Sequence, residues 1–219
     1  MCTITEMRVR MDIINDMINN LKRQSCDLLA TIRKISETNY ITDIRSFEYL
    51  TERLEMLSEK FTCSVRDFAQ KTFIVNRYEA LDKAGEMQGI EVRKDGNIIV
   101  IDLPFLLPKK KGKNHSFIGD PLWHKLAEVS QYEEFKIRGK AVVCIIHTYD
   151  NVNKDARCYD YDNLESKKIL DIVTLFTLTD DAPEYCDLYQ TVKLSNVDKT
   201  RILIMPFEEF LSKKTGLIF

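Results

Sequence analysis

The sequence predicts an α+β protein in which an N-terminal antiparallel helical hairpin precedes a small α/β domain with a mixed sheet flanked by helices. Three observations predict this fold class. Apolar residues recur every three or four positions through the first eighty residues, no glycine or proline precedes Gly85, and short strand-like runs alternate with helical segments after it. We therefore place the hairpin at residues 1–84 and the α/β domain at residues 85–219.

The hairpin is predicted from two apolar seams of the kind found in coiled coils. Residues 37–43 form a short polar break between them, with Thr42 or Asp43 as the expected N-cap of the second helix. Two helices joined this closely fold back on each other, and their seam either closes on itself or pairs with another subunit. The seam residues are Met11, Ile14, Ile18, Leu21, Ser25, Leu28, Ile32 and Ile35, then Phe47, Leu50, Leu54, Leu57, Phe61, Ser64 and Phe68.

The α/β domain is predicted from strands and helices that follow one another in short order. A turn at residues 94–96 separates strands at 90–93 and 97–102, and Pro121 opens a helix that reaches Val129. The continuous apolar run at 141–146 indicates a strand buried on both faces. A helix then follows Asn163 to about residue 173 or 176, and two further strands are expected at 188–193 and 201–205.

Four acidic residues make up the candidate site. Asp160 and Asp162 are two positions apart in an extended stretch, so both carboxylates can face one point. Asp180 and Asp181 follow the next helix, and the chain between them and the first pair is long enough to return. Carboxylates without cysteine or histidine favour a hard cation, Mg²⁺ or Mn²⁺, which suits phosphodiester hydrolysis.

The pattern from Asp160 to Asp181 resembles the D-x-D-N…K…D…D-D signature of RusA-type Holliday junction resolvases over about residues 90–206. The resemblance implies a metal-dependent, dimeric endonuclease with Mg²⁺ or Mn²⁺ as cofactor. Two positions depart from the family pattern, because the lysine and the helix aspartate both come one residue late. By this match the essential acids are Asp160, Asp162 and Asp181, the assisting metal ligand is Asp180, the catalytic lysine is Lys167, and the supporting residues are Asn163 and Asp171.

The resemblance implies branched DNA as substrate and partner, cleaved at its phosphodiesters by a homodimer. The basic loop after Pro108 is then the best candidate for contacts with DNA phosphates, through Lys109, Lys110, Lys111 and Lys113. The net charge of −2 argues against strong non-specific DNA binding. The alternative hypothesis is therefore a catalytically inactive protein that acts as an interaction or oligomerisation module through its helical hairpin.

Cysteine usage and hydropathy bear on the compartment. The six cysteines are scattered, without a C-x-x-C pair, which indicates free thiols in a reducing environment. The first residues lack a basic-then-apolar signal pattern, and no apolar run approaches the roughly 20 residues that span a bilayer. We therefore expect a cytoplasmic protein without a membrane partner.

Overall fold

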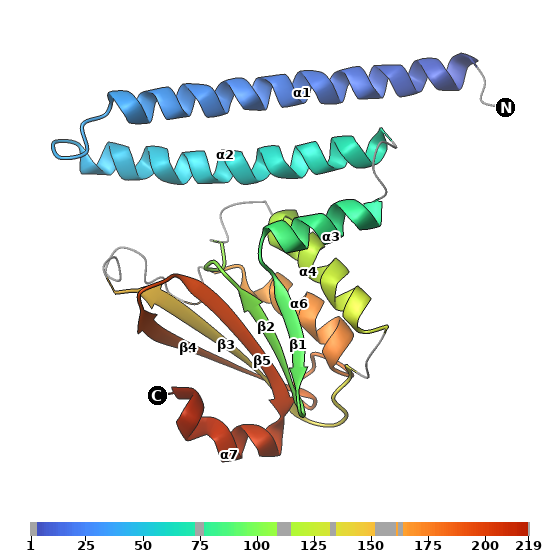
Figure 1. Ribbon diagram of the computed structural model, residues 1–219, viewed down its shortest axis with the longest axis vertical. Coiled ribbons are helices and arrows are strands. Elements are labelled where there is room, and N and C mark those ends of the chain that lie inside the picture. The colour runs from blue at the N-terminus through green and yellow to red at the C-terminus, as the bar shows by residue number, and fades with distance from the viewer. Residues whose placement is uncertain are drawn as a thin grey trace. The chain divides into compact units, whose positions relative to one another are not determined.

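The computed structural model describes residues 4–72, 77–108, 115–131, 135–151, 161 and 164–218. The chain divides into two compact units, Met1–Ala80 and Leu81–Phe219. The first contains a helical hairpin and the second a mixed five-stranded sheet with helices, and the described residues form six helices in all. The predicted α+β class is therefore confirmed (Figure 1).

Helices α1 (Ile4–Glu37) and α2 (Ile44–Lys71) form the hairpin and run antiparallel (Figure 1). Two polar side chains build the turn between them. The Asn39 Oδ1 atom accepts hydrogen bonds from the backbone nitrogens of Ile41 at 2.9 Å and Thr42 at 3.4 Å. The Asp43 carboxylate caps α2 by accepting from the Ser46 nitrogen at 3.2 Å, so Asp43 is the N-cap.

The remaining elements follow in the order helix, two strands, helix, strand, helix, two strands and helix. In the labels of Figure 1 these are α3 (Arg77–Met87), β1 (Glu91–Asp95), β2 (Ile98–Leu103), α4 (His115–Val129), β3 (Ala141–Asp150), α6 (Ser166–Thr177), β4 (Cys186–Ser195), β5 (Lys199–Pro206) and α7 (Phe207–Ile218).

The sheet has the strand order β1-β2-β5-β3-β4, in which β3 and β4 are parallel and every other pair is antiparallel. Residues 141–149 of β3 are all buried, as the apolar run predicts. Helices α4 and α6 cover one face of the sheet, where Leu122, Leu126 and Val173 are fully buried. Helix α7 covers part of the other face through Phe207 and Phe210. The sheet therefore has an apolar core on both sides.

Three helices differ from the sequence prediction. Helix α4 begins at His115 and contains Pro121 in its interior, although the sequence suggested Pro121 as its first residue. Leu122 and Leu126, one turn apart on the helix after the proline, are both fully buried. Their packing offsets the loss of the backbone hydrogen bond that proline cannot donate. Helix α3 runs through Gly85, and α7 starts directly after Pro206; neither was predicted. No described helix combines the length and the hydropathy needed to cross a membrane.

Candidate functional site

Part of the predicted acidic site lies outside the described residues. This holds for Asp160, Asp162 and Asn163, and equally for the proposed DNA-contacting side chains Lys109, Lys110, Lys111 and Lys113. Among the described residues, no group of three or more His, Cys, Asp or Glu side chains has an arrangement that could hold a metal ion. The Mg²⁺ or Mn²⁺ site therefore stays a prediction.

The described neighbours of that site are far apart along the sheet. Tyr161 stacks on His147 near the carboxyl end of β3, with ring centroids 5.7 Å apart. Asp180 and Asp181 precede β4, whose first residue, Cys186, pairs with Ala141 at the opposite end of β3. The six steps along the strand from Ala141 to His147 span about 20 Å. The described residues thus give no support to a meeting of Asp181 with the segment around Tyr161.

The remaining members of the predicted site are exposed. Lys167 and Asp171 lie on the solvent side of α6, whose buried face is formed by Ser166, Ile169 and Val173. The exposed Asp180 side chain accepts a hydrogen bond from the Ala182 nitrogen at 3.0 Å and so shapes the turn before β4. Each of these side chains has a surface position.

A buried polar cluster that the sequence did not reveal lies on the α6 face of the sheet. The fully buried His147 places Nε2 3.3 Å from the Gln190 Oε1 atom, which also accepts from the Ser166 hydroxyl at 3.5 Å. Thr200, the cross-strand partner of His147, is fully buried as well. Among the described residues, neither the His147 Nδ1 atom nor the Thr200 hydroxyl has a hydrogen-bond partner.

The electrostatics of this cluster keep His147 uncharged. Burial lowers the pKa of His147, and the hydrogen bond with Gln190 opposes the shift only in part. With Nε2–H donating to Gln190, Nδ1 is the acceptor nitrogen of the neutral ring. Such a nitrogen can accept a hydrogen bond or a proton. No spacing in the sequence indicates this polar cluster, because Gln190 and Thr200 come close to His147 only through the pairing of β3 with β4 and β5.

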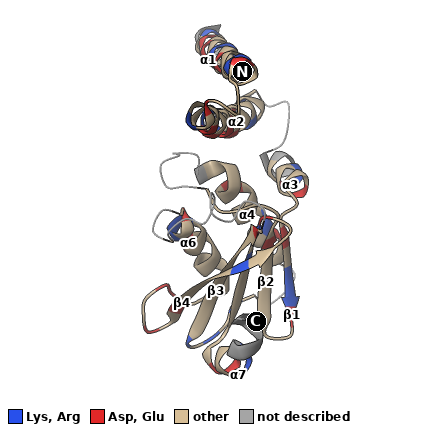
Figure 2. Ribbon diagram, turned by 90° about the vertical axis from the view of Figure 1, so that its left-hand side faces the viewer, with Lys and Arg blue, Asp and Glu red and all other residues tan. Residues whose placement is uncertain are grey.

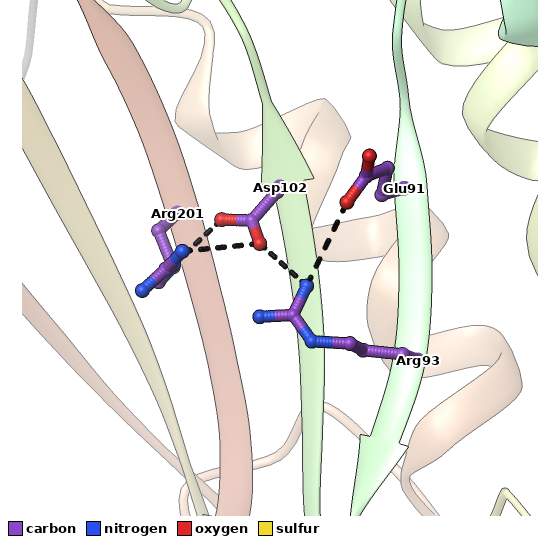
Figure 3. A network of polar contacts seen from close by, with 4 residues as sticks. All are labelled: Glu91, Arg93, Asp102 and Arg201. Carbon is purple, nitrogen blue, oxygen red and sulfur yellow. Dashed lines mark hydrogen bonds and ion pairs between the residues drawn. The ribbon is translucent and has the colours of Figure 1, made fainter.

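The other face of the sheet carries a charged network that crosses three strands (Figure 3). Asp102 on β2 accepts from Arg201 on β5, at 2.5 Å to Nε and 3.2 Å to an NH₂ group, and from Arg93 on β1 at 2.6 Å. Glu91 lies 3.9 Å from the Arg93 guanidinium. Burial acts to raise the pKa of Asp102, but the hydrogen bonds from Arg201 and Arg93 outweigh it and lower the pKa. The network ties β1, β2 and β5 together and is structural.

The hairpin has an unusual seam. Between residues 8 and 72, the buried side chains are those of two polar residues, Gln24 and Thr31, and no apolar side chain there is buried. The Gln24 amide donates to the Ser64 hydroxyl at 3.0 Å across the hairpin. Of the predicted seam residues of α1, Met11 and Ile32 are exposed and the other six are half-buried, whereas all seven of α2 are half-buried. The hairpin therefore leaves much apolar surface open to solvent.

One family of proteins matches the chain, over residues 9–213, and it is described as "Family of unknown function (DUF6100)". The chain belongs to this family. Because the match includes α1 and α2 as well as the sheet, the hairpin is part of what defines a DUF6100 protein. No curated protein matches the chain.

Two solved structures are similar to parts of this DUF6100 protein. The periplasmic domain of MotB (residues 64-256) has a TM-score of 0.34 and 8% identity, and the similarity covers 59% of this chain and 74% of that chain. The periplasmic domain of Helicobacter pylori MotB (residues 90-256) has a TM-score of 0.34 and 7% identity, covering 59% and 87%. Similarity at this TM-score says nothing about activity.

The identification as a RusA-type resolvase is therefore wrong. The family whose model matches the chain, over residues 9–213 and thus nearly its whole length, is DUF6100 and not the RusA-type resolvases. The expected partner, branched DNA bound by a homodimer, is wrong for the same reason, since both came from the RusA resemblance. The resemblance rested on a short pattern of acids, which also occurs as turn and helix-cap chemistry.

Proposed function

We propose that this DUF6100 protein is a non-catalytic binding protein whose hairpin recruits a helical segment of another protein. The observation that carries the proposal is the seam described above, in which α1 and α2 bury Gln24 and Thr31 but no apolar side chain between residues 8 and 72. Most of the stability of a helix in a protein comes from packing of its apolar face. A partner helix supplies the burial that the hairpin does not give itself.

The exposed apolar side chains of the hairpin are numerous, whereas the second unit keeps its large apolar side chains mostly in its core. Leu29 is 64% exposed, and it lies near Ile32 on the same side of α1. Contiguous exposed apolar surface marks interaction sites. The other exposed apolar residues along the two helices are Val9, Met11, Ile13, Ile44, Tyr49, Met56 and Val65.

The charges of the hairpin favour a protein partner. Helix α1 carries six basic and five acidic residues, and α2 carries five of each. Both signs are spread around both helices (Figure 2). Nucleic acids and anionic membranes are bound by a surplus of basic side chains, which this surface lacks. Alternating charges beside an apolar stripe are instead typical of helices that pair with other helices.

The proposal is tested in the full-length chain with a photo-crosslinking amino acid at Leu29, expressed in the protein's own cell. Asp27, exposed on the opposite side of α1, is the matched control position. We expect one protein to be cross-linked from Leu29 but not from Asp27. The same protein, once purified, should bind the purified chain and bind the Leu29→Glu variant at least tenfold more weakly.

Three outcomes would overturn the proposal. The first is the absence of any Leu29-specific cross-link, and the second is cross-linking to a second copy of the chain alone. The third is a purified pair whose affinity Leu29→Glu leaves unchanged. Circular dichroism of Leu29→Glu shows whether the helices are retained, which is expected because the side chain is largely exposed.

A further inference from the structure

The turn of the hairpin carries apolar side chains where a turn between helices usually carries polar ones. Ile41 is 83% exposed, Tyr40 is 60% exposed, and Ile44 at the start of α2 is 49% exposed. The three lie within five residues of one another, so they form one apolar cluster, which we call the tip. Scattered exposed apolar residues need no explanation, but a cluster at a projecting turn does.

The tip does little for the hairpin's own fold. Asn39 and Asp43 stabilise the turn. The Asn39 amide oxygen accepts hydrogen bonds from the backbone nitrogens of Ile41 and Thr42, and the Asp43 carboxylate accepts one from the nitrogen of Ser46. The Tyr40 ring contacts Phe47 edge-on, with centroids 5.1 Å apart, and this contact holds the ring in place. Ile41, at 83% exposure, contributes almost no burial. Polar residues at 41 and 44 would serve the turn as well.

From this cluster we infer that the tip inserts into an apolar pocket of the partner protein, with Ile41 as its central anchor. The inference rests on the proposed function and deepens it, since it adds a contact at the tip to the contact that the two helices make with the partner. Side chains that are held in place and exposed before binding lose little conformational freedom on binding, which is the property of an anchor. The ring contact with Phe47 holds the Tyr40 side chain, and the hydrogen bond from the Ile41 nitrogen to Asn39 holds the backbone of Ile41.

The charges near the tip distinguish a protein pocket from a lipid surface. The residues from 33 to 48 include three basic and three acidic side chains, and Arg33 is paired with Glu37 at 3.2 Å. Membrane insertion of an apolar loop is normally supported by basic residues beside it. The tip has no such surplus. A protein pocket lined by apolar side chains is therefore the partner surface that fits the neutral, apolar tip.

The test compares Ile41→Asp with Thr42→Asp in the full-length chain. Both positions are exposed in the same turn, and both variants add one negative charge. The partner is first identified by a photo-crosslinking amino acid placed at Ile41 and is then purified. Burial of an isoleucine side chain corresponds to roughly a tenfold to hundredfold change in affinity. We expect Ile41→Asp to weaken binding by at least that much and Thr42→Asp to change it less than threefold.

Each other result overturns the inference in a recognisable way. If Ile41→Asp binds as the wild type does while Leu29→Glu binds weakly, the tip inference is wrong and the proposed function stands. If neither variant changes binding, both are wrong. If the wild type, but not Ile41→Asp, sediments with vesicles made of equal parts of phosphatidylcholine and phosphatidylserine, the tip binds lipid and the inference is wrong.

Discussion

Replacing Gln24 with methionine should stabilise the hairpin. Gln24 is buried in the seam, where its Nε2 atom donates to the Ser64 hydroxyl at 3.0 Å. Its Oε1 atom is buried without a hydrogen-bond partner among the described residues. A buried carbonyl left unpaired costs about 1–3 kcal/mol, whereas the hydrogen bond that the change removes contributes about 1 kcal/mol. Methionine has the same length and a similar helix propensity.

The balance favours methionine by about 1–2 kcal/mol, because it also buries apolar atoms in place of the amide. Amide hydrogen exchange reports the free energy of local opening, and this gain corresponds to exchange slowed roughly 5-fold to 30-fold in α1. The assay is exchange with mass spectrometry on the full-length chain, with peptides from β3 as internal reference. Gln24→Glu should act in the opposite direction. Unchanged or faster exchange in the Gln24→Met variant would refute the reasoning.

Three further predictions concern the second unit. Asp102→Asn weakens the charge-assisted contacts with Arg93 and Arg201 and should lower the free energy of unfolding by about 1–3 kcal/mol. Because the pKa of Asp102 is lowered in the folded state, this stability is present above about pH 3.9 and is lost as the pH falls through the folded pKa. Urea unfolding of the wild type and of Asp102→Asn between about pH 7 and pH 3 tests this. Burial lowers the pKa of His147, so protonation favours the unfolded chain, and the free energy of unfolding should decline below about pH 6.5. An equal decline in the His147→Gln variant would assign the effect to other groups. Burial raises the pKa of Cys144 to about 11, so iodoacetamide should modify the exposed Cys26 and leave Cys144 intact, as peptide mass spectrometry will show.

The hairpin and the buried strand β3 could be predicted because their signals are local. Seams of apolar residues at helical spacing predict the hairpin, and the continuous apolar run at residues 141–146 predicts β3, whose first nine residues are buried in the structure. Details of the seam could not be predicted. A helix turns every 3.6 residues, so a heptad pattern drifts along a long helix. Gln24 and Thr31 therefore occupy the enclosed positions, while Ile32 points outward.

The polar groups of the second unit could not be predicted for a different reason. Asp102 and Arg201 are 99 positions apart, and they meet only because β5 returns to lie beside β2. His147 and Gln190 are 43 positions apart and meet through the pairing of β3 with β4. The acidic pattern that suggested a nuclease was the opposite case, because a short motif is visible in a sequence whether or not the fold brings its residues together.

The strand order has a consequence for how the chain is made. The last strand, β5, lies in the middle of the sheet, between β2 and β3. A growing chain that lacks residues 199–206 would contain the β1–β2 pair and the β3–β4 pair as separate pieces, each with an open edge and an uncovered apolar face. The sheet of the second unit is therefore completed only after residues 199–206 have been made, and the chain is most prone to aggregate just before that point. Helices α1 and α2 make local contacts and can pair much earlier, while the ribosome is still adding the sheet.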